Sequence, residues 1–163
     1  MKKETFSVLV ENRFGVLTRV AGLFSGRGYN IDSLTVSPTQ NPDYSRMTIV
    51  TGGDEDILEQ IEKQLNKLVE VVKVIRLTTG GFVARELVLF KLACTPVQRP
   101  EILQICTSYD AKVVDMQPDS MVVQLTDISE KVEEFATVLQ SFGIIELART
   151  GMVALARSSR PTE

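Results

Sequence analysis

The chain has 163 residues, of which 44% are hydrophobic and 24% charged, and its formal net charge is −3. This composition is typical of a globular protein, and the slight negative charge gives no general attraction to nucleic-acid backbones or anionic lipids. Histidine is absent, which removes the commonest general base and transition-metal ligand and so disfavours an enzyme. We find neither an apolar signal region nor a run of roughly 20 apolar residues, and therefore expect a cytoplasmic protein without a membrane span.

The first half of the chain reads as a βαββαβ unit. Residues 5–11 alternate polar and apolar side chains, which is typical of a strand. Helical spacing begins at Val16, and Gly28 stands where a helix commonly ends in a left-handed residue. Asp54 is a suitable N-cap for a second helix. The remaining strands are expected over residues 30–36, 47–51 and 69–77.

The same order of elements returns after Gly80 and Gly81. Strands are expected over residues 86–94, 112–116, 121–126 and 144–156, with helices around residues 102–109 and 128–141. The pattern predicts an α+β fold with two ferredoxin-like sandwiches in tandem, each a four-stranded antiparallel sheet with two helices on one face. We place the domains at residues 1–78 and 82–157, followed by a tail at 158–163.

The connection between the first strand and the first helix is the best candidate for a binding site. The first N–H groups of a helix lack internal partners and carry the positive end of its dipole, which suits a carboxylate. Gly15 permits a close approach to the backbone, and the side chains of Asn12 and Asn30 can both donate and accept hydrogen bonds. The alternative is that Asn12 and Gly15 serve only as turn and cap residues.

Other groups of residues are explained without a ligand. Residues 26–28 contain two glycines but end a helix, whereas a phosphate loop opens one. The acidic residues 54–56 suit the first turn of a helix, so we expect no metal site there. Cys94 and Cys106 are not spaced as metal ligands and are expected to be free, buried thiols. A basic run (Lys63, Lys67, Lys73 and Arg76) is typical of a solvated face.

Several segments resemble one protein family. The opening VLVENRFGVLTRV (8–20) is similar to the start of an ACT domain. The next segment, GLFSGRGYNIDSLTV (22–36), resembles the signature of acetolactate synthase small subunits, and the likeness continues in SRMTIV (45–50), QIEKQLNKL (60–68) and IELARTG (145–151). The resemblance covers nearly the whole chain and strengthens the ligand interpretation of the loop that contains Gly15.

The resemblance implies a regulator without catalytic residues. Members of this family bind a larger, thiamine-diphosphate-dependent catalytic subunit, raise its activity and make it sensitive to a branched-chain amino acid, usually valine. They form dimers through ACT domains paired side by side, with effector sites at that interface. The implied site comprises Asn12, Gly15, Val16 and Leu17 of one chain with Asn30 and Ile31 of the facing chain. No metal or cofactor is implied beyond the amino-acid effector.

Two features qualify the resemblance. The loop carries Arg13 and Phe14 before Gly15, where smaller or acidic residues are common. The equivalent place in the second half holds residues 95–98, without the asparagine and glycine, so we expect no effector site there.

Two other function classes share this order of elements. Single-strand RNA-binding domains stack bases on aromatic side chains of the sheet, but the predicted third strand has no aromatic residue and the chain is acidic. A small enzyme on this fold also stays open, because a fold does not fix a function. An RNA shift assay, or turnover by the chain alone, would distinguish them.

Overall fold

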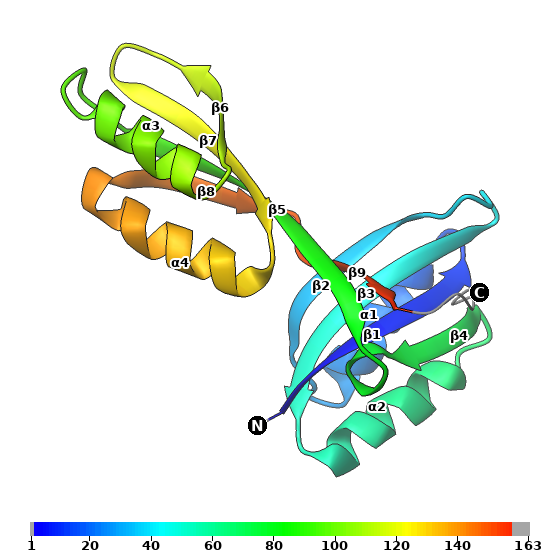
Figure 1. Cartoon of the computed structure of the whole chain (residues 1–163). Helices are drawn as coiled ribbons and strands as arrows, with labels where there is room; N and C mark the ends of the chain where they lie inside the picture. Colours follow the sequence, from blue (N-terminus) through cyan, green and yellow to red (C-terminus); the bar gives the residue numbers. More distant parts are fainter. Residues whose placement is uncertain (1, 158–163) are drawn as a thin grey trace. The chain divides into compact units, whose positions relative to one another are not determined.

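A computed structural model describes residues 2–157, and the predicted tail at residues 158–163 lies outside this range. The described residues form two compact units, one of residues 2–84 with 152–157 and the other of residues 85–151. Each unit contains the predicted βαββαβ order, with helices on one face of an antiparallel sheet (Figure 1). No helix formed by residues 2–157 is long and apolar enough to span a bilayer.

The first sheet has the strand order β2-β3-β1-β4, so β2 lies at an edge, as the split βαβ pattern predicts. The elements of this unit are β1 (Lys2–Glu11), α1 (Val16–Gly26), β2 (Ile31–Pro38), β3 (Tyr44–Gly53), α2 (Glu55–Asn66), β4 (Val71–Arg76) and a 3-10 turn, η1 (Leu77–Thr79). The core lies between sheet and helices because Phe6, Val8 and Val10 alternate toward the helix side of β1, and all three are fully or almost fully buried.

Both helix ends predicted in this unit from local residues are confirmed. The side chain of Asp54 accepts a hydrogen bond from the backbone N–H of Ile57 over 2.9 Å and caps α2. Gly28 adopts a left-handed φ of 69° just beyond α1, where glycine costs least. Both helix ends depend on residues that are close in sequence, which explains why the sequence predicts them well.

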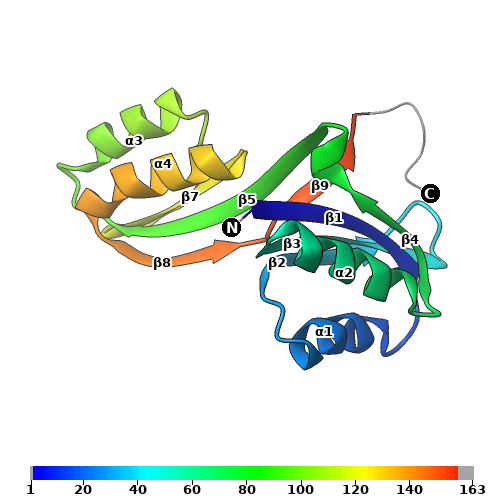
Figure 2. The same ribbon diagram turned by 90° about the horizontal axis from the view of Figure 1, so that it is seen from below.

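The face of the first sheet away from the helices is also covered. Thr5, Ser7 and Thr48 point to this face, yet all three are buried. The strand β9 (Val153–Ala156) pairs with β5 (Phe82–Ala93), and these strands cross the face opposite α1 and α2 (Figures 1 and 2). Ala154 of β9 is only 5% exposed, which is consistent with its close packing in the first unit.

The second sheet has the order β6-β7-β5-β8. Its other elements are α3 (Arg99–Ser108), β6 (Lys112–Met116), β7 (Ser120–Asp127), α4 (Ser129–Leu139), a 3-10 turn, η2 (Gln140–Phe142), and β8 (Ile144–Arg149). Phe90 on β5 meets Phe135 on α4 edge-to-face, with ring centroids 5.3 Å apart. Cys94 and Cys106 are free and buried in this core, as predicted, and burial raises the pKa of the Cys106 thiol.

The structure corrects the prediction of one strand over residues 144–156. Strand β8 ends at Arg149, the backbone turns at Gly151 with a left-handed φ of 84°, and β9 begins at Val153. The separation has a physical cause, because β9 pairs with a partner distant in sequence and packs with the first unit. The division into compact units assigns residues 152–157 to the first unit, and the domain at residues 82–157 stays a prediction.

Candidate functional site

The loop after β1 is tied to the connection between β2 and β3. The backbone N–H of Asn12 donates to the carbonyl of Asp43 over 2.8 Å, and its Nδ2 donates to the carbonyl of Pro42 over 2.9 Å. Asn12 thus acts as a turn residue, in agreement with the simpler interpretation of the sequence. The side-chain oxygen of Asn12 can still accept a hydrogen bond.

Gly15 occupies the N-cap position of α1 and leaves the start of the helix open. Its backbone is left-handed, with φ 85° and ψ −9°, and no side chain among the described residues caps the helix. A Cβ atom added at Gly15 would meet nothing within 4 Å. Because the first turn of α1 also lacks an acidic residue, the positive end of the helix dipole has no carboxylate in that turn.

The two residues after Gly15 differ in exposure. Val16 is buried against the core, whereas Leu17 is 44% exposed. Leu17 therefore provides an accessible apolar contact next to the first N–H groups of α1. A small ligand with a carboxylate and an aliphatic group has complementary partners at this place.

A shallow depression lies on the other side of the start of α1. It is lined by Arg13, Phe14, Val16, Arg19 and Glu70. Since Leu17 and Arg19 are two positions apart in a helix, their side chains point in nearly opposite directions around its axis. The bulky residues Arg13 and Phe14 thus border the side that Arg19 occupies.

Charges in this depression are paired within the chain. Arg19 Nη1 lies 2.5 Å from Glu70 Oε1, and Arg13 forms an ion pair with Glu11. Glu70 Oε2 is buried and has no hydrogen-bond partner among residues 2–157. The sequence does not indicate Glu70 as a partner of Arg19, because it lies 51 positions from Arg19 and no local pattern links the two residues.

Asn30 and Ile31 stand where the chain enters β2. Asn30 Nδ2 donates to Asp32 Oδ1 over 2.6 Å, and the carbonyl of Asn30 accepts from Thr51 Oγ1 over 2.5 Å. Ile31 is half-buried and packs against the core of the first unit. The side-chain oxygen of Asn30 and part of Ile31 are thus available at the exposed edge of the sheet.

One chain does not bring these two groups of residues together. Strand β3 pairs Thr51 with both Ile31 and Glu4, whereas Tyr44 at its other end pairs with Glu11. From Glu4 to Glu11 there are seven steps of about 3.3 Å, or roughly 23 Å. The loop with Gly15 and the entry to β2 therefore lie at opposite ends of the first sheet.

Other candidate groups are used in structural contacts. The acidic residues 54–56 include the α2 cap, and Glu55 pairs with Lys2 and Arg76. No group of three or more metal-ligating side chains occurs among the described residues.

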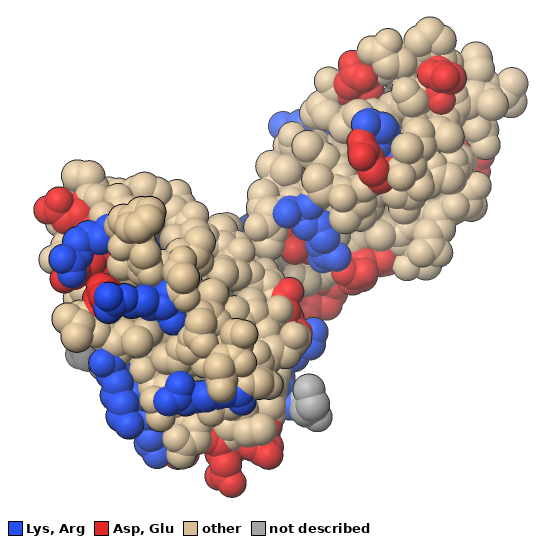
Figure 3. Space-filling model, turned by 180° about the vertical axis from the view of Figure 1, so that it is seen from behind, with Lys and Arg blue, Asp and Glu red and all other residues tan. Residues whose placement is uncertain are grey.

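In the second unit, Gln98 Oε1 accepts from the N–H and the hydroxyl of Thr95, which closes that loop on itself. Figure 3 shows basic side chains spread among acidic ones over one face.

Comparisons with known proteins agree with the tandem fold. The model for the AHAS small subunit-like ACT domain matches residues 6–73, and the model for the small subunit of acetolactate synthase matches residues 85–158. A probable acetolactate synthase small subunit of Archaeoglobus fulgidus is 48% identical over 158 residues, which cover 97% of this chain and 99% of that protein. The chain belongs to the acetolactate synthase small-subunit family.

Two further relatives support this assignment to the small-subunit family. The acetolactate synthase isozyme 3 small subunit of Escherichia coli is 46% identical over 159 residues, covering 97% of this chain and 98% of that protein. The crystal structure of the acetolactate synthase small subunit from Thermotoga maritima has a TM-score of 0.89 and 38% identity, covering 98% of this chain and all of that one. The family resemblance and the fold of two ferredoxin-like sandwiches are thereby confirmed. All six residues of the candidate site fall within the ACT-domain match.

Proposed function

We propose that this chain is the non-catalytic regulatory subunit of an acetolactate synthase. It binds and activates the thiamine-diphosphate-dependent catalytic subunit in the cytoplasm and confers feedback inhibition by a branched-chain amino acid, with valine as the first candidate and leucine and isoleucine as the others. The proposal rests on the family and on an amino-acid site in the first unit.

The observation that carries the proposal is the open start of α1 at Gly15. A carboxylate placed there gains hydrogen bonds from unpaired N–H groups and roughly 0.3–2 kcal/mol from the helix dipole. The free side-chain oxygens of Asn12 and Asn30 can accept hydrogen bonds from an α-ammonium group. Leu17 and Ile31 offer apolar surface to an aliphatic side chain, which favours a branched-chain amino acid over a polar one.

We assign the two halves of the site to two copies of the chain in a symmetric homodimer. Strand β2 is an edge strand, and an unpaired edge attracts another strand. If β2 meets its own copy antiparallel across a two-fold axis, the Ile31 end of one strand lies beside the Pro38 end of the other. Pro38 pairs with Ser45, which in turn pairs with Val10 near the end of β1. This arrangement brings the Gly15 loop of one copy toward Asn30 of the other.

The proposal is tested with two variants of Gly15. Gly15→Asp places a negative charge where the effector carboxylate binds, whereas Gly15→Asn adds a side chain of nearly equal size without the charge. Both residues tolerate the left-handed backbone better than most, so strain is matched. We expect Gly15→Asp to abolish valine binding in calorimetry and valine inhibition of acetolactate formation with the catalytic subunit, while stimulation persists.

Gly15→Asn should weaken valine binding less than Gly15→Asp, and Asn30→Ala should do the same because it removes a polar partner without adding repulsion. Unchanged valine affinity in Gly15→Asp would show that the effector does not bind at this loop. Failure of the wild-type chain to alter the catalytic subunit's rate would contradict the regulatory role itself.

A further inference from the structure

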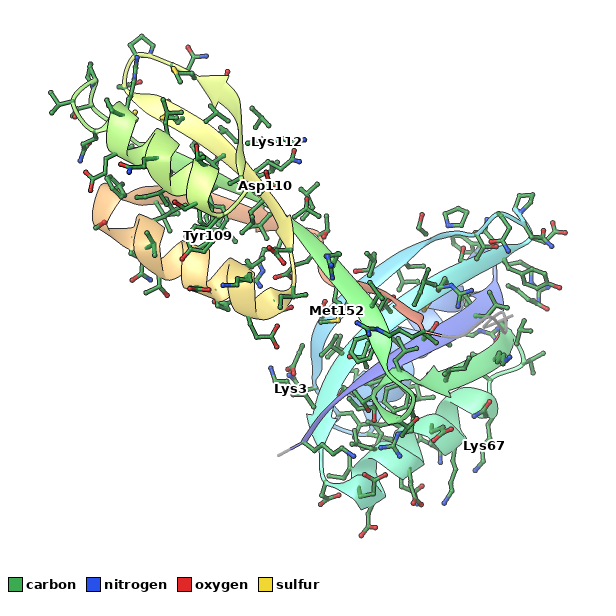
Figure 4. The ribbon with its side chains drawn as sticks, viewed as in Figure 1. Lys3, Lys67, Tyr109, Asp110, Lys112 and Met152 are labelled. Atoms are coloured by element: carbon green, nitrogen blue, oxygen red, sulfur yellow. The ribbon has the colours of Figure 1, made fainter. Side chains whose placement is uncertain are left out.

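Met152 contacts two strands of the first sheet, β2 and β1. On the face away from the helices, Ser33 of β2 and Thr5 of β1 both pair with Val50 of β3, so the three residues form one row. The N–H of Met152 donates to Ser33 Oγ over 3.1 Å, and Thr5 Oγ1 lies 4.0 Å from Met152 Sδ. Figure 4 labels Met152 in front of this sheet. A single residue from the carboxy-terminal segment thus bridges the edge strand and the central strand β1.

The segment that follows Met152 is held firmly in the first unit. Strand β9 pairs with β5, and beyond β9 the N–H of Arg157 donates to the carbonyl of Gly81 over 3.1 Å. Thr5 beneath it is only 4% exposed and Val50 only 8%. Because Met152 donates directly to Ser33 and the segment after it is anchored, a shift of β2 at Ser33 disturbs this hydrogen bond.

Met152 is also the first residue of the first unit after the chain leaves the second. Two positions earlier, the N–H of Thr150 donates to the carbonyl of Leu87 over 3.0 Å, in line with the pairing of β8 and β5. Residues 150–152 therefore join a hydrogen bond of the second unit to the contact at Ser33. Only Gly151 separates the residues that make these two hydrogen bonds.

Ser33 lies close to the effector half-site that we assign to β2. The register of β2 against β3 shifts between Ile31 and Ser33, which marks a local irregularity. A ligand that contacts Asn30 and Ile31 therefore acts at this irregularity, next to Ser33, and can shift the position of Ser33.

We propose that the contact between Ser33 and Met152 couples effector binding at β2 to residues 85–151. The inference rests on the proposed function, because it needs an effector at Asn30 and Ile31. Ser33 and Met152 are positioning residues in this account: neither touches the effector, and both transmit its effect. Coupling between two sites typically changes an affinity by a factor of roughly 5–150, and a contact with two arrangements is one physical means of carrying it.

The test compares Ser33→Ala with Ser37→Ala in the full-length chain. Ser33→Ala removes the acceptor of the Met152 N–H, whereas Ser37 lies exposed near the other end of the same strand. We measure valine affinity by calorimetry, valine inhibition in the reconstituted holoenzyme, and hydrogen exchange of residues 152–156. Ser33→Thr keeps a hydroxyl at the position and serves as the rescue variant.

We expect Ser33→Ala to bind valine within about twofold of wild type, while the ratio of activities without and with saturating valine falls roughly fivefold or more. Exchange at residue 152 should become faster in this variant, and Ser37→Ala and Ser33→Thr should behave as wild type. Full inhibition in Ser33→Ala would overturn the inference but leave the regulatory function standing. A wild-type holoenzyme that does not respond to valine would overturn both.

Discussion

Arg76 Nε donates to Glu4 Oε2 over 3.1 Å, at a carboxylate that is completely buried. Glu4 also accepts hydrogen bonds from the N–H of Thr5 and from the N–H and hydroxyl of Thr78. Arg76 in turn contacts Glu55 at the start of α2. This network joins β1, β4 and α2, and Arg76 supplies the cation that balances the buried charge of Glu4.

Replacement of Arg76 by methionine should strongly destabilise the first unit. The substitution leaves the Glu4 carboxylate buried without a cation, which typically costs about 3–5 kcal/mol. Urea unfolding measures the loss. Lys73→Met on the same strand is the control and should change stability by no more than about 0.5 kcal/mol. Equal effects of the two variants would show that the network is not a stabilising one.

Stability should fall in acid as Glu55 is protonated. Hydrogen bonds from Arg76 and Lys2 lower the pKa of Glu55 from 4.5 to about 2. Because the folded-state pKa lies below the unfolded one, the stabilising contribution is complete above pH 4.5 and is lost as the pH falls toward 2. The difference in urea midpoint between wild type and Glu55→Gln should therefore shrink over this range. A difference that is constant with pH would contradict the assignment, and Glu62→Gln on the same helix serves as the control.

Asp110→Gly should stabilise the second unit. Asp110 follows α3 with φ 56°, and within residues 2–157 it is the one non-glycine residue with positive φ (Figure 4). Glycine adopts this conformation without strain, so we expect a gain of about 0.5–1 kcal/mol. Asp119→Gly is the matched control, because Asp119 has no positive φ and should gain nothing. A lower melting temperature in Asp110→Gly would refute the argument.

The packing of β9 on the first sheet can be tested with two substitutions. Ala154→Asp buries a charge without a partner and should cost about 2 kcal/mol or more. Leu155→Asp, one position later, places the same charge on a side chain that is 58% exposed and should cost little. Far-UV circular dichroism during urea unfolding compares them. Similar losses would indicate that β9 does not pack closely on the first unit.

The sequence predicts features that depend on neighbouring residues and misses those that depend on distant ones. The cap at Asp54 and the turn at Gly28 are local, and both were predicted. The break before β9 was not, because its partner strand begins about 70 residues earlier and its pairing leaves no local pattern. The contact between Met152 and Ser33 joins residues 119 positions apart. Hydrophobic periodicity cannot predict this contact for the same reason.

The central claim is an effector site shared between two chains, and mixed dimers test it most directly. We would combine equal amounts of Gly15→Asp and Asn30→Trp chains, each unable to bind valine as a homodimer, and measure binding by calorimetry after subunit exchange. Half of the dimers are then mixed and contain one intact site, so binding should return at about one valine per four chains. No recovery in verified mixed dimers would contradict the account, because it would show that the two groups of residues do not form one site across the two chains.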